Sequence, residues 1–245
     1  MLKGPASILY GRIEPGGLIN LNTKKPLDIP YYSIEQEFGS FEHYRTIWDG
    51  TGPLTADKSL LYRISGAYQN SDSFRDFHET ERFIIDPSVT WRPTAATEMS
   101  LDVEVFRQDF QVDYGISAIG DRPAPVPIER SFQDPNDPLD EINKVHLGFN
   151  LTHAFNDNWK LQNRFLATFT DSFDFDVVPS PEFDASALQA DNRTLDRNIF
   201  FQEFDGDVYS TNLDLTGKLN LWGTRHEVLV GVDYFERVCE IPHSG

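Results

Sequence analysis

Carboxylates, histidines and hydroxyl groups are the side chains of this chain that could carry chemistry. Asp102 and Glu104 stand two residues apart, so in a strand both lie on one face, as acid–base catalysis could require. The residues around them, Leu101, Val103 and Val105, are apolar and fall on the opposite face. This alternation favours a wet surface lined by carboxylates over a catalytic pair.

The remaining reactive residues form no recognisable site. The six histidines show no HExxH or other metal-ligand spacing: His43, His78, His146, His153, His226 and His243. The stretch from Asp134 to Asp137 offers oxygen ligands for Ca²⁺, but its spacing is not that of an EF-hand and favours a solvated turn. No nucleophile elbow and no phosphate-binding glycine loop is present. We therefore predict no enzyme activity, no resident metal and no cofactor.

Charge and composition narrow the class of protein further. The chain of 245 residues has 39 acidic against 21 basic residues, and its net charge of −18 repels nucleic acid. Its 13% aromatic content is too high for a disordered acidic chain. No apolar run is long enough for a transmembrane helix. Cys239 is the only cysteine, which excludes a disulfide within the chain.

A period of two recurs along the chain and predicts strands. Leu60, Tyr62, Ile64 and Tyr68 fall on one face of such a strand, opposite a second set of Leu61, Arg63, Ser65, Ala67 and Gln69. The same pattern returns segment after segment, with Ile84 as an apolar exception on a polar face. Nine strands are expected, at residues 31–38, 44–50, 60–69, 82–92, 98–105, 144–152, 159–169, 207–221 and 226–238. About ten alternating residues between turns are typical of a transmembrane β-barrel strand.

The connections alternate in length. Residues 93–97, 156–158 and 222–225 are predicted tight turns, whereas 109–141 and 171–199 are predicted long, acidic loops. Outer-membrane barrels have short periplasmic turns and long external loops. Trp91, Trp159 and Trp222 stand where strands meet short turns, as in an interfacial aromatic girdle.

The opening segment carries the most specific pattern. Turns at residues 2–5 and 14–17 flank short apolar strands expected at 7–10 and 18–22. The matched positions are Lys3-Gly4-Pro5, Leu9-Tyr10-Gly11, Pro15-Gly16-Gly17, Ile19-Asn20 and Thr23-Lys24-Lys25-Pro26. This string resembles the end of the plug domain of TonB-dependent siderophore receptors, of the ferrichrome type. Residues 87–93, PSVTWRP, are similar to a strand ending of the same family.

The resemblance implies a fold and a function. The fold is all-β: residues 1–27 would end a plug domain, and residues 28–245 would form about nine of the 22 strands of an antiparallel transmembrane barrel. The function would be uptake of a ferric siderophore across the bacterial outer membrane. It would be energised by TonB, with ExbB and ExbD, through an N-terminal part that precedes this sequence. No signal peptide is found, and we expect a fragment that does not transport alone.

The resemblance also implies site residues. Phe110 and Tyr114 follow the fifth predicted strand, and Tyr114-Gly115 is similar to an aromatic-Gly step that contacts the siderophore in ferrichrome-type receptors. Ile116 stands where some relatives have a second aromatic residue, which departs from ferrichrome specificity. Lys3 and Arg12 are expected to pair with acidic residues of the barrel wall.

Three alternatives stay open at this point. Cobalamin and sugar receptors share the architecture, although the plug string favours siderophores. A porin-like barrel or adhesin would share the alternation but has no reason to carry the plug string. A soluble carbohydrate-active β-protein would pack its apolar strand faces, including those of Leu101, Phe149 and Leu213, against a second layer.

Overall fold

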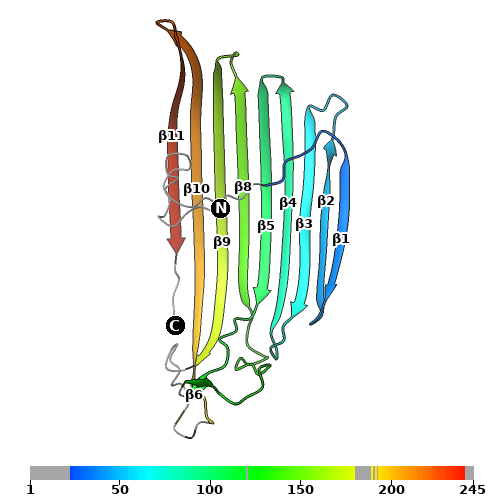
Figure 1. Cartoon of the computed structure of the whole chain (residues 1–245), viewed down its shortest axis with the longest axis vertical. Helices are drawn as coiled ribbons and strands as arrows, with labels where there is room; N and C mark the ends of the chain where they lie inside the picture. Colours follow the sequence, from blue (N-terminus) through cyan, green and yellow to red (C-terminus); the bar gives the residue numbers. More distant parts are fainter. Residues whose placement is uncertain (1–22, 120, 180–188, 190, 192, 241–245) are drawn as a thin grey trace.

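The computed structural model describes residues 23–119, 121–179, 189, 191 and 193–240, and the predicted strands within 1–22 lie outside this part. The described residues form one nine-stranded sheet in the order β1-β2-β3-β4-β5-β8-β9-β10-β11, all antiparallel (Figure 1). A small pair, β6 and β7, lies in the loop after β5. The strands are β1 (Tyr31–Gly39), β2 (His43–Pro53), β3 (Leu60–Asp72), β4 (Glu79–Thr94), β5 (Thr97–Phe110), β6 (Ala118–Ile119), β7 (Arg122–Pro123), β8 (Asp140–Ala154), β9 (Trp159–Pro179), β10 (Arg197–Leu221) and β11 (Thr224–Glu240).

The period of two gives the sheet one apolar and one polar face. The register joins apolar residues across five strands, from Tyr62 through Val89, Leu101 and Phe149 to Phe165. Side chains one position away in each strand point to the other face, which is largely polar. All nine predicted strands of the main sheet are therefore confirmed, including the two short ones at the start.

The apolar face has no second protein layer among the described residues, because the nine long strands all belong to the same sheet. Leu101 and Leu213 of this face are 52% and 42% exposed. The packed second layer that a soluble sandwich requires is therefore missing from the described part of the chain. In the same part, no helix is both long and apolar enough to cross a membrane.

The hairpins alternate between two ends of the sheet (Figure 1). At one end β4 and β5, β8 and β9, and β10 and β11 are joined by the predicted short turns. Trp222 and Gly223 form the last of these with φ of 50° and 79°, the conformation of a two-residue type I′ hairpin. Trp222 is 94% exposed at this end, and Trp91 and Trp159 lie near it as expected.

The predicted loop over residues 171–199 is wrong at both ends. β9 continues to Pro179 and β10 begins at Arg197, so the connection covers only residues 180–196. Asp171, Asp174 and Asp176 gave this stretch a loop-like composition, but Phe173 and Phe175 alternate with Asp174 and Asp176. The acidic side chains of Asp174 and Asp176 take one face of the sheet and the phenylalanines the other, which keeps the period of two.

Residues 23–30 precede β1 and cross the polar face of the sheet. The segment passes over β5, β4 and β3 before it reaches the start of β1 at the short-turn end (Figure 1). Leu61 of β3 and Thr51 of β2 are fully buried on this face, and the segment contacts Thr51 through the amide of Leu27. The segment therefore shields part of the polar face of the sheet from solvent.

Candidate functional site

An ion-pair cluster fixes residues 23–30 to the polar face. Asp49 of β2 accepts two hydrogen bonds from the Arg63 guanidinium, at 2.9 Å from Nε and 2.6 Å from Nη2. Lys24 donates to the same carboxylate at 2.9 Å. Asp49 and Arg63 are only 6% and 11% exposed, whereas the Lys24 side chain is mostly exposed. Two cations therefore converge on one buried carboxylate, and one of them belongs to the crossing segment.

Backbone groups of the segment complete its attachment. Arg63 Nη1 donates to the carbonyl of Lys25 at 2.8 Å, so one guanidinium joins β2, β3 and the segment. The amide of Leu27 donates to Thr51 Oγ1 at 2.9 Å, and this hydroxyl donates to the carbonyl of Tyr62 at 2.8 Å. These bonds satisfy polar groups that the segment buries, and they hold it in one position on the wall.

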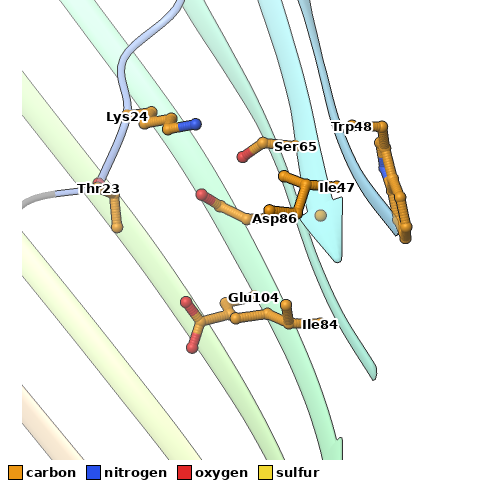
Figure 2. A pocket seen from close by; sticks show the side chains of 9 residues that line it. Thr23, Lys24, Ile47, Trp48, Ser65, Ile84, Asp86 and Glu104 are labelled. Carbon is orange, nitrogen blue, oxygen red and sulfur yellow. The ribbon is translucent and has the colours of Figure 1, made fainter. Parts of the chain in front are cut away.

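A hollow of about 300 Å³ opens beside this cluster, between Thr23, Lys24 and the sheet (Figure 2). Ser65, Asp86 and Glu104 point into it from three neighbouring strands, and Ile84 lines it as well. The sequence predicted Ile84 as an apolar exception on the polar face, and its side chain lines the hollow. Glu104 thus lies on the polar face of the sheet. That this face lines a wet lumen stays a prediction.

Further carboxylates adjoin the hollow. Ile85 pairs with Val105 and Ser88 with Asp102, which places Asp86 beside Glu104. Glu104 lies 3.6 Å from His146. Asp102 lies over Gly148 of β8, where any Cβ would clash with the carboxylate oxygens. A side chain at residue 148 would displace the Asp102 carboxylate, so the glycine at this position leaves space for that carboxylate.

The predicted ligand-contacting residues lie at the opposite, long-loop end. Phe110 is the last residue of β5, pairs with Asp140 and is half-buried. Tyr114 is also half-buried, and burial together with the Asp176 carboxylate raises the pKa of its hydroxyl. The structure thus brings both aromatic residues to one end of the sheet, and their contact with a ligand stays a prediction.

The loop that carries Tyr114 is fastened to the loop between β3 and β4 and to the first residue of β10. Arg75 donates to Asp113 at 2.8 Å and to the carbonyl of Ile128. His78 and Ser131 form a buried hydrogen bond of 2.9 Å, and Arg197 donates to the carbonyl of Phe132 at 2.6 Å. This long loop is therefore held at several points and provides a fixed support for Tyr114.

Asp140 lies under the same loop and is 1% exposed. A bilayer takes about 9 to 11 residues of a tilted strand, so Asp140, fourteen positions from the short turn in the 15-residue β8, lies beyond such a span. It accepts a hydrogen bond from the Phe175 amide at 2.7 Å. Burial raises the pKa of Asp140 to about 6, and the carboxylates of Asp176 and Asp174 add to the shift.

No cluster of three or more metal-ligating side chains occurs within the described residues. In the acidic turn, Asp134 accepts hydrogen bonds from the amide and side chain of Asn136, at 3.0 and 2.9 Å. The turn thus uses this carboxylate in hydrogen bonds within the turn. Lys3 and Arg12 lie outside the described residues, so their predicted pairing stays a prediction.

Sequence reasoning missed the cluster of Lys24, Asp49 and Arg63. All three residues lie within segments that the sequence analysis described. No spacing in the sequence, however, indicates that β2, β3 and a segment before β1 come into contact. Only a weak signal was available in the sequence. Asp49 and Arg63 are charged residues within two strands that were predicted from their apolar residues.

Comparison with known proteins yields relatives along nearly the whole chain, although no family model matches. Metal-pseudopaline receptor CntO of Pseudomonas aeruginosa is 35% identical over 234 residues, which are 96% of this chain and 32% of that receptor. The ferrioxamine B receptor of Salmonella typhimurium is 26% identical over 97% of this chain and 34% of its own length. The ferrichrome outer membrane transporter/phage receptor of Escherichia coli is 24% identical over 96% and 34%. The chain spans about a third of the length of these relatives.

Solved structures share the fold. The ferric-catecholate import receptor Fiu from Escherichia coli superposes with a TM-score of 0.82 at 19% identity, over 97% of this chain and 38% of Fiu. The siderophore receptor PiuA from Acinetobacter baumannii gives 0.81 at 18% identity, over 99% and 37%. The expected fold class, part of an antiparallel receptor barrel, is therefore confirmed.

Proposed function

The chain belongs to the TonB-dependent siderophore receptors, and from this premise we propose that it forms part of an outer-membrane receptor that takes up a metal–siderophore complex. The observation that carries the proposal is the two-sided sheet. Its apolar face suits the hydrocarbon of a bilayer, and its polar face suits a water-filled, plugged lumen. The relatives that share this sheet are receptors or transporters, and no enzymatic role is proposed.

The substrate class follows from the relatives and the long-loop end. Similarity to ferrioxamine, ferrichrome and pyoverdine receptors favours a ferric siderophore as the ligand of the complete receptor. The metal-pseudopaline receptor favours a second candidate, a metal–pseudopaline complex. Tyr114 and Phe110, at the long-loop end, are the proposed aromatic contacts for a chelate that enters from outside. The chelate is cargo, and the proposal includes no resident cofactor.

The partners follow from the same family. We propose that TonB, with ExbB and ExbD, supplies the energy through an N-terminal segment that precedes residue 1 in the complete receptor. Residues 1–27 would then be the end of a plug domain and residues 28–245 the first part of the barrel. Outer-membrane lipid would cover the apolar face.

Radiolabelled uptake tests this proposal. A full-length receptor that contains this chain is produced in a strain without its own siderophore receptors. Uptake of ⁵⁵Fe-ferrioxamine, ⁵⁵Fe-ferrichrome, ⁵⁵Fe-pyoverdine and a radiolabelled metal–pseudopaline complex is then measured. We expect uptake of at least one chelate, and loss of that uptake when TonB is deleted. Uptake of cobalamin or a sugar alone, or diffusion that does not depend on TonB, would overturn the proposal.

A further inference from the structure

Three buried side-chain oxygens at the long-loop end have no hydrogen-bond partner among the described residues. They are Asp140 Oδ2, Asp176 Oδ1 and Gln111 Oε1. Asp140 is 1% exposed and Asp176 is 9% exposed. Carboxylate and amide oxygens can only accept hydrogen bonds, so these atoms cannot satisfy one another. Buried acceptors without a partner are unfavourable, and a donor or a cation is therefore expected beside them.

Asp140 is held against the end of β9. It accepts the Phe175 amide through Oδ1 at 2.7 Å, which leaves its Oδ2 unpaired. By the register of β8 and β9, Asp140, Asp174 and Asp176 share the polar face of the sheet. Besides burial, the carboxylates of Asp176 and Asp174 raise the pKa of Asp140, so negative charge gathers here without compensation.

The loop after β5 is attached to β9 at the same place. Gln133 Nε2 donates to the carbonyls of Val112 and Val177, at 3.4 and 3.2 Å. Gln111 precedes Val112, and Asp176 precedes Val177. The single amide group of Gln133 therefore brings the backbone beside Gln111 close to the backbone beside Asp176.

Basic side chains of the described residues do not supply the cation. Neither Asp140 nor Asp176 forms an ion pair in this part of the chain. Arg75 and Arg197, which hold the same loop, donate to other groups. Ca²⁺ takes about six to eight oxygen ligands and combines carboxylates with neutral oxygens in irregular geometry, whereas Mg²⁺ requires near-octahedral geometry and keeps several waters. Buried carboxylate and amide oxygens therefore favour Ca²⁺.

We propose that the carboxylates of Asp140 and Asp176 bind a Ca²⁺ ion between β8, β9 and the loop after β5, with neutral oxygens such as Gln111 Oε1 completing its shell. The sequence analysis expected no resident metal because residues 111, 140 and 176 are far apart along the chain, and only the fold brings them together. The raised pKa of Asp140 belongs to the chain without this ion.

The ion fastens the start of the loop to the sheet. Asp176 also faces the Tyr114 hydroxyl, so the same carboxylate joins the ion to the predicted ligand-contacting aromatic residue. The position of the site outside the cell rests on the proposed function, but the binding of Ca²⁺ does not. Extracellular modules bind Ca²⁺ with dissociation constants of about 0.1–1 mM, and we expect this range here.

Equilibrium dialysis with ⁴⁵Ca²⁺ tests the site in the full chain, refolded in detergent micelles at neutral pH and physiological salt. We expect saturable binding of one ion in the range given above, which an equal concentration of Mg²⁺ does not displace. Asp140→Asn and Asp176→Asn should each weaken binding about tenfold or more. Asp171→Asn is the matched control on β9, because Asp171 is exposed on the opposite face, and its affinity should stay within about twofold of the wild type.

Hydrogen exchange shows whether the ion fastens the loop. Ca²⁺ should slow amide exchange about tenfold within residues 111–114 and 174–177 of the wild type, and should leave it unchanged in Asp140→Asn. Exchange in β3 and β4 of the same samples shows that the sheet of each variant is intact. The proposal is overturned by the absence of saturable binding, by equal affinities in the wild type and both site variants, or by Mg²⁺ binding as tight as that of Ca²⁺.

Discussion

Replacing Asp49 by asparagine should release residues 23–30 from the wall. The carboxylate neutralises Arg63 and Lys24, and both Asp49 and Arg63 are almost fully buried. Removing one partner of a buried ion pair costs about 3 kcal/mol or more, because the other charge stays buried. The fraction of molecules with the segment detached should therefore rise by roughly 100-fold, at 1.36 kcal/mol per tenfold.

Trypsin measures this fraction at the peptide bond between Lys24 and Lys25. The chain is refolded in detergent micelles, and the protease concentration is kept low, so that cleavage tracks the equilibrium population of the detached segment. We expect the cleavage rate of Asp49→Asn to rise by about two orders of magnitude, while the gel mobility of the folded sheet stays unchanged.

Glu98→Gln is the matched control. Glu98 binds Arg92 at 2.8 Å on the same face of the sheet, but both side chains are more than 40% exposed. Exposed pairs contribute less than about 1 kcal/mol, so the cleavage rate should change by less than about fivefold. Equal rates for the wild type and Asp49→Asn, or equal increases in the two variants, would refute the argument from burial.

Three further changes test other parts of the structure. Gly66→Ala should destabilise the folded chain by about 1–3 kcal/mol in urea, since its Cβ would lie 2.6 Å from the Ile84 carbonyl, whereas Gly50→Ala, with 3.3 Å to Tyr32, should cost clearly less. The folded pKa of Asp140 lies above the ordinary value near 4, so stability should fall by roughly 2 kcal/mol as the pH rises from about 4 to about 6 and should stay lower above it. Asp140→Asn should remove that pH dependence, and an unchanged pH profile would contradict the assignment. The isolated chain should also aggregate without detergent, since its sheet has two open edges and an apolar face; a monodisperse monomer in plain buffer, seen by light scattering, would argue against this.

The faces of the sheet were predictable because alternation is a local property of sequence. Leu101 and Asp102 differ in polarity, and the pleat alone sends them to opposite sides. The short turns were also readable from Pro, Asn and Gly. The end of β9 could not be predicted. Asp174 and Asp176 gave its last residues the high charge of a loop, although the polar face of a strand can also hold carboxylates.

The candidate site was much less predictable. The contact of Lys24 with Asp49 joins residues 25 positions apart, and only the register of β2 and β3 brings Arg63 to the same carboxylate. Ile84 was visible as an exception to the alternation, but the hollow that it lines depends on where residues 23–24 cross the sheet. Such contacts follow from tertiary geometry, which spacing along the chain does not encode.

Spin-label accessibility along β5 tests the central claim that the apolar face meets lipid. Single nitroxide labels are placed at residues 100–105 of the Cys239→Ser chain in liposomes, and collisions with oxygen and with a water-soluble nickel complex are compared. We predict that labels at Leu101, Val103 and Val105 favour oxygen, and that labels at Asp102 and Glu104 favour nickel. Equal accessibility at all positions, or the reverse alternation, would contradict the account.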